Sequence, residues 1–403
     1  MFSLATLCIP GRLETGAGSL GKLAGLVAAE GASKVLIIMD SILAKDPLNV
    51  HQKVGNILKE GNIEFDLFSD CTGEPTTLDV NNAVQKAQEV NAECIVAVGG
   101  GSALDIAKAV SLFAINPDVK WGEIVQKEHL KCVPIIAIPT TAGTGSEATK
   151  IMVITNAETN SKMNPGHPAL TPKVAILDPE LSVSLPKNFT AFTGMDALTH
   201  AIEGYVSTRA TELSDFFAIE SIKLCGQALE AVYDNGADLD ARQKMLLASY
   251  YAGVAFSNAS TNLAHAAGRA LGAKFHIPHG LSVTVLLPFV MTLGLDAAQE
   301  RYANVARALG ADSSLGESDL AKEAVRMVEE YNNKFMIWDG AKKFIKDTKE
   351  FRNSIPALVE DAMIGVKLNP KGNNGIITNR RIPTADDIKF MFEKLADMID
   401  GVK

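Results

Sequence analysis

The chain has 403 residues, of which 47% are hydrophobic, 21% charged and 6% aromatic, a composition typical of soluble globular proteins. A chain of this length exceeds what one hydrophobic core organises, so we expect two domains. Its 38 basic and 47 acidic residues give a formal charge of −9, which leaves no basic excess for a phosphate backbone and argues against nucleic-acid binding.

Cysteine spacing and hydropathy indicate the cellular compartment. The five cysteines are scattered and contain no C-x-x-C pair, which argues against a disulfide framework and a thiolate zinc site. The N-terminal segment lacks a basic region, and Pro10 and Gly11 interrupt its apolar run. No segment approaches the roughly 18 uninterrupted apolar residues that cross a bilayer. We therefore expect a cytoplasmic protein with no membrane partner.

Short apolar runs alternate with amphipathic segments in the first half of the chain. We expect strands at 33–40, 63–70, 93–100 and 133–140, and helices at 47–60, 78–90 and 102–114. Continuous apolar strands separated by helices indicate a parallel sheet that is covered on both faces. In such sheets ligands bind outside the carboxyl ends of the strands.

A glycine run follows the third of these strands. Gly99, Gly100 and Gly101 directly precede Ser102 at the start of a predicted helix. Glycine lets the backbone approach a phosphate closely, and a helix N-terminus supplies free N–H groups. The run differs from both G-x-G-x-x-G and the Walker pattern, and a tight strand-to-helix turn is the alternative. We favour phosphate binding.

Two other strand ends agree with a nucleotide site. Asp40 closes the strand at 33–40, where a carboxylate can accept hydrogen bonds from a ribose diol and repel a 2′-phosphate. The loop PTTAGTGSEAT at 139–149 follows another strand, and its hydroxyls and glycines suit a phosphate, ribose or nicotinamide. The alternatives are a turn residue or helix cap for Asp40 and an ordinary solvated connection for the loop.

From Lys187 onwards the pattern becomes almost entirely helical. Helices are expected at 189–207, 211–233, 238–257, 259–272, 280–293, 297–309 and 316–334, with more towards the end. We place the domain boundary near Pro186, which gives an α/β domain over 1–187 and an all-α domain over 188–403.

Metal-ligand residue types cluster in the helical half. Asp196 and His200 are four residues apart in FTGMDALTHAIEGY, so they share one face of a helix. NLAHAAGRALGAKFHIPHG then supplies His265, His276 and His279. An isolated D-x-x-x-H pair is more often a structural polar pair, but a carboxylate and several imidazoles together suit a divalent metal.

The motifs GGGSALDIAK, PTTAGTGSEAT, AILDPEL, FTGMDALTHAIEGY and LGAKFHIPHG, in this order, resemble those of the iron-containing alcohol dehydrogenases, a group that includes lactaldehyde reductase. A GEPT turn at 73–76 and a TNRRIPTADD segment at 378–387 extend the resemblance over most of the chain. The resemblance implies a dehydroquinate synthase-like fold, in which an α/β parallel-sheet NAD-binding domain precedes an all-α metal-binding domain. It also implies a homodimer or higher homo-oligomer.

The resemblance implies ligands for one divalent metal, Fe²⁺ rather than the alternative Zn²⁺: Asp196, His200, His265 and His279. It also implies the following contacts to NAD(H): Asp40, Gly99, Gly100, Gly101, Ser102, Asp105, Thr140, Thr141, Thr144, Thr149 and Leu181.

One position departs from the family pattern. Many relatives have a histidine one turn after the first C-terminal ligand, where this chain has Arg269. Arginine stays protonated and cannot act as an ordinary base, but its planar fork suits an anionic group of the substrate. Lys150, Lys162 and His167 would add positive charge if their loops approach the cleft. The alternative is a salt bridge within the helical domain, and His276 is our candidate for the missing proton relay.

We therefore expect a metal-dependent, NAD-dependent oxidoreductase acting on CH–OH groups, which interconverts a short-chain aldehyde and its primary alcohol. Arg269 favours an acidic aldehyde such as sulfoacetaldehyde or a semialdehyde. The first alternative is a generalist alcohol or diol dehydrogenase of the lactaldehyde, propanediol or butanol type. A non-redox lyase like dehydroquinate synthase and a metal or nucleotide sensor are further alternatives.

Overall fold

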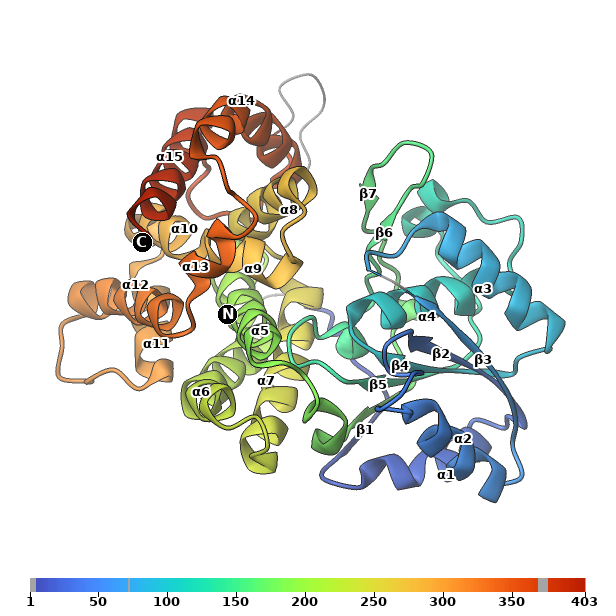
Figure 1. Ribbon diagram of the computed structural model, residues 1–403. Helices are drawn as coiled ribbons and strands as arrows, with labels where there is room; N and C mark the ends of the chain where they lie inside the picture. The colour runs from blue at the N-terminus through green and yellow to red at the C-terminus, as the bar shows by residue number, and fades with distance from the viewer. Residues whose placement is uncertain (1–4, 72, 369–375, 403) are drawn as a thin grey trace. The chain divides into compact units, whose positions relative to one another are not determined.

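The structure is a computed structural model that describes residues 5–71, 73–368 and 376–402. Two compact units make up the chain (Figure 1). The sheet unit consists of Cys8–Leu185 and Gly236–Ser257, and the helical unit consists of Met1–Leu7, Pro186–Asn235 and Asn258–Lys403. The chain thus passes from the first unit to the second at Leu185–Pro186 and later returns to the sheet unit for one helix.

The sheet unit contains a six-stranded parallel sheet, so the predicted parallel sheet is confirmed. Its strand order is β1 (Arg12–Thr15), β8 (Val174–Leu177), β5 (Ile135–Pro139), β4 (Cys94–Gly99), β2 (Lys34–Asp40) and β3 (Glu64–Cys71). The four strands expected from the sequence match β2 to β5 within two residues at each end. Strands β1 and β8 and the small hairpin of β6 (Ile154–Thr155) and β7 (Lys162–Met163) were not predicted, because each is too short for a periodic signal.

Side chains on the two faces of the sheet form two hydrophobic cores. Leu36 and Ile38 of β2 pack in a core with α3 (Thr77–Glu89) and α4 (Gly101–Phe113). The alternate β2 residues Val35, Ile37 and Met39 pack in a second core with α1 (Leu23–Ala29) and α2 (Val50–Glu60). Figure 1 shows these helix pairs on opposite faces of the sheet. Since successive strand residues point to opposite faces, burial of both faces explains the continuous apolar runs.

Helices alone make up the described part of the helical unit. They are α5 (Lys187–Val206), α6 (Glu212–Asp234), α8 (Leu263–Phe275), α9 (His279–Thr284), α10 (Leu287–Gly294), α11 (Gln299–Leu309), α12 (Glu317–Lys334), α13 (Ile337–Lys342), α14 (Thr348–Gly365) and α15 (Ala385–Gly401). The single helix expected at 280–293 was wrong, because α9 ends and α10 begins within it. Pro288 has no N–H and its ring would clash with the carbonyl of Thr284, which explains the break.

One stretch, His279–Ala297, is apolar and long enough to cross a membrane, with a mean hydropathy of 1.7. Polar residues such as Ser282, Thr284 and Asp296 interrupt it, so it is not the uninterrupted apolar run that the sequence was expected to lack. It comprises α9, α10 and a short 3-10 turn, and 56% of it is buried inside the protein. Partial burial of this kind is typical of a core helix.

Helix α7 (Leu239–Ala259) lies in sequence among the helices of the helical unit, yet it packs mostly with the sheet unit. The contact depends on two glycines. A Cβ atom on Gly253 of α7 would lie 2.5 Å from the carbonyl oxygen of Gly145, and Gly145 itself has a φ of +59°. Ser249 Oγ accepts a hydrogen bond from the Gly145 N–H at 3.2 Å. The loop after β5 and α7 therefore meet backbone to backbone, with no room for a side chain.

Replacement of Gly253 by Ala is expected to destabilise the protein, although Ala is normally the better helix former by about 1 kcal/mol. Its methyl group would overlap Gly145 and lie 3.0 Å from Ala148 Cβ, and such overpacking costs about 1–3 kcal/mol. Chemical denaturation followed by circular dichroism measures the change. Gly25→Ala is the matched control, because a Cβ atom on Gly25 of α1 meets nothing within 4 Å. A Gly253 variant at least as stable as the Gly25 variant would contradict this packing.

Candidate metal centre

Helix α5 supplies one half of the candidate metal centre. It is buried on all sides and packs against α6 and α9, as expected for a helix whose apolar residues surround its axis. Asp196 is 2% exposed and His200 is 5% exposed. Since they are one turn apart, both side chains leave the same face of α5.

The other half comes from the starts of α8 and α9. His265 lies in the first turn of α8, and His279 is the first residue of α9. A Cβ atom on Gly280 would lie 2.4 Å from the Phe192 carbonyl oxygen on α5. Only glycine allows α9 to approach α5 so closely, and this approach places His279 beside Asp196.

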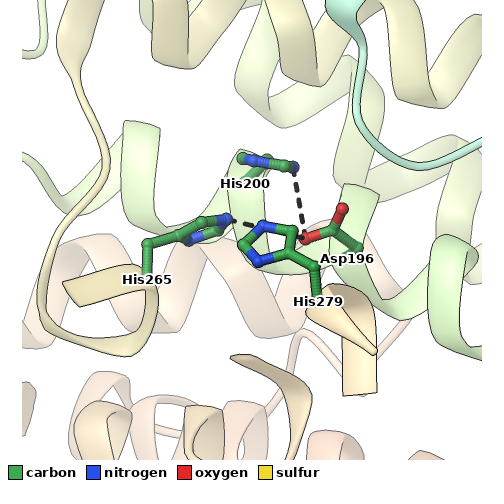
Figure 2. A group of neighbouring side chains, drawn as sticks. All are labelled: Asp196, His200, His265 and His279. Atoms are coloured by element: carbon green, nitrogen blue, oxygen red, sulfur yellow. Dashed lines mark ion pairs between the residues drawn. The ribbon is translucent and has the colours of Figure 1, made fainter. Parts of the chain in front are cut away.

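The ligand atoms of Asp196, His200, His265 and His279 all lie within 4.8 Å of one another (Figure 2). Asp196 Oδ1 is 3.6 Å from His200 Nδ1, 3.5 Å from His265 Nε2 and 3.9 Å from His279 Nε2. The His200 and His265 rings are 4.2 Å apart between centroids. The four predicted ligands therefore converge on one point.

Some buried polar atoms of this cluster lack a hydrogen-bond partner within the described part of the chain. Asp196 Oδ1 and His265 Nε2 are buried and have no hydrogen-bond partner among the residues that the structure describes. Buried polar atoms are nearly always satisfied, and a bound ion is one recognised explanation for an exception. Three imidazoles and one carboxylate are suitable ligands for Fe²⁺ or Zn²⁺. The residues present thus fit a divalent cation.

The charges within the cluster are strongly coupled. Burial alone would raise the pKa of Asp196, but His200, His265 and His279 outweigh it and hold that pKa well below its usual range. Burial lowers the pKa of His265, while Asp196 and Glu203 raise it to about 9. Because metal ligation requires a neutral imidazole, a cation that binds here must displace that proton.

Glu203, a 1% exposed residue of α5, was not among the residues predicted from the sequence. Its Oε2 atom is 2.6 Å from His265 Nδ1, and its Oε1 atom accepts a hydrogen bond from the Ala264 N–H at 2.6 Å. Asp196, His200 and Glu203 follow an i, i+4, i+7 spacing, so helical periodicity places all three on one face. That spacing was the signal that could have identified Glu203.

Arg269 and His276 occupy different positions relative to the cluster. Arg269 lies on α8 one turn after His265 and is partly buried. Burial lowers its pKa, and the negative charge of Glu203 opposes this effect. Within residues 5–71, 73–368 and 376–402 it makes no ion pair, so the salt bridge considered as an alternative is not observed there. His276 is exposed at the C-cap of α8 and is not part of the cluster.

The sheet unit holds the residues expected to contact the cofactor. Gly99 has a φ of +153°, and a Cβ atom there would lie 2.5 Å from Asp40 Oδ2. Asp40 Oδ2 accepts a hydrogen bond from the Gly100 N–H at 2.6 Å, and burial raises the pKa of Asp40 despite this bond. A Cβ atom on Gly101 would lie 2.8 Å from Thr144 Cγ2. No side chain caps the N-terminus of α4, so its first N–H groups are available to a phosphate.

Two of the expected cofactor contacts, Asp105 and Thr149, form hydrogen bonds within the protein. Lys108 is fully buried, and its Nζ atom donates to Thr149 Oγ1 at 2.8 Å, Ser146 Oγ at 2.7 Å and the Ile151 carbonyl at 2.6 Å. Asp105 accepts hydrogen bonds from Ser146 Oγ at 2.6 Å and the Val153 N–H at 2.8 Å. These bonds fasten the loop after β5 to helix α4.

The other expected contacts are placed as follows. Thr140 is 6% exposed, and Leu181 is 7% exposed within the α1–α2 core. Ser102 and Thr141 are partly buried at the carboxyl ends of β4 and β5.

Lys162 and His167 both have partners within the sheet unit. Lys162 Nζ forms an ion pair with Glu74 Oε1 at 2.5 Å. His167 Nδ1 accepts a hydrogen bond from the Ala169 N–H at 3.1 Å, so this nitrogen carries no proton.

Comparison with protein families defines the class. Residues 10–179 match the model of the iron-containing alcohol dehydrogenases, and residues 190–395 match the C-terminal model of the Fe-containing alcohol dehydrogenase family. The chain therefore belongs to the iron-containing alcohol dehydrogenase family, and the resemblance found in the sequence is confirmed. It is an oxidoreductase of the class that acts on CH–OH groups.

Individual relatives extend this result. The chain is 37% identical to the NAD-dependent methanol dehydrogenase of Bacillus methanolicus over 82% of this chain and 87% of that protein. It is 30% identical to a solved 1,3-propanediol oxidoreductase, with a TM-score of 0.88 over 98% of this chain and all of the other. It is 27% identical to sulfoacetaldehyde reductase from Bifidobacterium kashiwanohense, solved in complex with NAD⁺, with a TM-score of 0.81 over 98% and 99% of the two chains.

Replacement of Gly280 by Ala is expected to weaken metal retention about 10-fold or more, the range seen when the support of a ligand is removed. The added methyl group forces α9 away from the Phe192 carbonyl and shifts His279. Elemental analysis after dialysis against a chelator measures the metal content per chain. Gly401→Ala, in the same unit, is the control because a Cβ atom there meets nothing within 4 Å. Equal retention by both variants would show that the close approach of α9 and α5 is unimportant.

Proposed function

We propose that this protein is an NAD(H)-dependent aldehyde reductase and alcohol dehydrogenase that uses one divalent metal ion, with Fe²⁺ as the physiological metal and Zn²⁺ as the alternative. The observation that carries the proposal is the convergence of Asp196, His200, His265 and His279 in a chain of this family. When bound, the ion supplies Lewis acidity towards the substrate oxygen. The four side chains would hold the ion, and the burial of Asp196, His200 and His265 limits the access of water.

The nucleotide preference rests on the sheet unit. Asp40 ends β2 beside the glycine run, where a carboxylate favours a ribose diol and repels the 2′-phosphate of NADP. The uncapped N-terminus of α4 offers N–H groups and a positive dipole end to the pyrophosphate. The NAD-dependent methanol dehydrogenase and the sulfoacetaldehyde reductase bound to NAD⁺ support the same preference.

The substrate we propose is a short-chain aldehyde with an anionic group, such as a sulfonate or carboxylate. Arg269 is a partly buried cation one turn from His265 and has no ion pair within the part of the chain that the structure describes. A guanidinium binds such groups through two parallel hydrogen bonds, which would orient the carbonyl end of the substrate. The similarity to sulfoacetaldehyde reductase supports this substrate class. His276 is exposed and is retained only as a candidate proton relay.

A generalist dehydrogenase of neutral alcohols or diols is the second candidate. It is favoured by the similarity to 1,3-propanediol oxidoreductase and to methanol dehydrogenase, whose names specify uncharged substrates. Our proposal includes action as a homo-oligomer in the cytoplasm, for which sedimentation and cell fractionation are the direct measurements.

Metal-loaded protein is expected to oxidise NADH in the presence of a short-chain aldehyde, and protein stripped with a chelator is expected to lose this activity and regain it with Fe²⁺ or Zn²⁺. The measurement is absorbance at 340 nm with a panel that pairs each neutral aldehyde with an acidic analogue of similar size. Failure of every aldehyde in the presence of metal would exclude the reductase. Equal rates within each pair would favour the generalist.

Arg269→Gln is expected to lower kcat/KM for the acidic aldehyde by about 100-fold, because it removes a charge-assisted pair worth about 2–5 kcal/mol. The rate with the neutral analogue should stay within a few-fold. Arg352→Gln is the matched control, since Arg352 on α14 is 39% exposed and already pairs with Asp397 and Asp400. An equal loss on both aldehydes would mean that Arg269 has a structural role instead.

A further inference from the structure

We propose that Glu203 is a positioning residue, which fixes the metal-facing nitrogen of His265 and thereby determines how tightly the helical unit retains its divalent cation. This inference rests on the metal centre of the proposed function. It concerns the carboxylate behind the ligands rather than the ligands themselves.

Both carboxylate oxygens of Glu203 contact polar groups in the first turn of α8. Oε2 is 2.6 Å from His265 Nδ1, and Oε1 accepts a hydrogen bond from the Ala264 N–H at 2.6 Å. In addition, Asn262 Nδ2 donates to the Glu203 carbonyl at 2.8 Å. One residue of α5 therefore contacts Asn262, Ala264 and His265 of the segment that carries the ligand.

The contact with His265 determines which ring nitrogen carries a proton. An ionised carboxylate can only accept, so His265 Nδ1 must be protonated to bond with it. The remaining nitrogen, Nε2, is then the one that offers a lone pair to a cation once its proton is displaced. It points to Asp196 Oδ1 at 3.5 Å, and neither atom has a hydrogen-bond partner among the described residues. A cation that contacts both atoms satisfies both, which is the arrangement expected of a carboxylate–histidine–metal series.

The contact with Ala264 fixes the backbone from which the ring projects. Asn262, the N-cap residue of α8, makes no side-chain capping bond. Glu203 supplies the missing acceptor from another helix, and its negative charge lies at the positive end of the α8 dipole. The same side chain therefore constrains both the helix start and the ring orientation of His265.

Glu203 also affects the net charge of the metal-bound site. Three neutral imidazoles with a divalent cation carry a charge of +2, which Asp196 and Glu203 together balance. Arg269, whose pKa responds to the charge of Glu203, then leaves one positive charge near a neutral centre. An anionic substrate group would match that charge, whereas a chain without Glu203 would leave the buried centre with a further positive charge.

The decisive variant is Glu203→Gln, which preserves shape but replaces one acceptor by a donor. If its oxygen still accepts from Ala264, its NH₂ group faces His265 Nδ1 and favours the ring tautomer with the proton on Nε2. If the amide is reversed, the bond to Ala264 is lost. We expect the variant to bind Co²⁺ about 10–100-fold more weakly than the unaltered full-length protein, in competition with a chromophoric chelator. The visible absorption spectrum of its Co²⁺ complex should also change.

Thr384→Ala is the control for a purely structural effect. Thr384 caps α15 in the same unit by accepting a hydrogen bond from the Asp387 N–H at 3.1 Å. Its loss should lower the melting temperature and leave the Co²⁺ affinity and spectrum unchanged. A Glu203 variant that behaves like this control would overturn the inference and reduce Glu203 to a helix cap.

A second measurement needs no variant. In the Zn²⁺-loaded full chain labelled with ¹⁵N-histidine, NMR should show His265 protonated on Nδ1 and bound through Nε2. Binding through Nδ1 would overturn the inference even if the variant did not fold. Failure of the unaltered protein to bind Co²⁺ or Zn²⁺ would instead reject the metal centre of the proposed function, and the inference with it.

Discussion

The structure of the helical unit depends on a buried carboxylate that must be compensated. Asp196 is 2% exposed, and one of its oxygens has no hydrogen-bond partner among the described residues. An uncompensated buried charge is costly, so three imidazoles from three helices surround it. These side chains do not provide every hydrogen bond that the cluster requires, since His265 Nε2 also lacks a partner among the described residues. A divalent cation bound between Asp196 and His265 would give both atoms a partner.

Glycine residues allow the helices that carry these side chains to pack closely enough for the side chains to meet. Gly280 brings α9 against the Phe192 carbonyl of α5, and Gly268 brings α8 against Val283 of α9, where a Cβ atom would lie 2.7 Å from Val283 Cγ1. A similar close contact occurs in the sheet unit, where Gly253 and Gly145 allow α7 to pack against the loop after β5. Both candidate sites therefore depend on backbone approaches that any side chain would prevent.

Periodicity and motif order predicted the parallel sheet, the helical second half and the four residues of the Asp–His cluster, because each of these has a local signal. Two features had no local signal, and a third had one that was overlooked. The pairing of α7 with the sheet unit depends on Gly253 meeting Gly145, which are distant in sequence. Asp105 and Thr149 both form hydrogen bonds with the buried Lys108. Residue spacing in the sequence does not predict that Lys108 is buried beside them. Glu203 did share the helical spacing of the ligands, but its partner His265 lies on another helix.

The most direct test of the central claim is anomalous X-ray diffraction from crystals of the Fe²⁺- or Zn²⁺-loaded protein, recorded at the absorption edge of the metal. We predict a single strong peak in each chain, within about 2.0–2.2 Å of an oxygen of Asp196 and a nitrogen of each of His200, His265 and His279. A peak elsewhere, or none in protein that retains metal, would contradict the account.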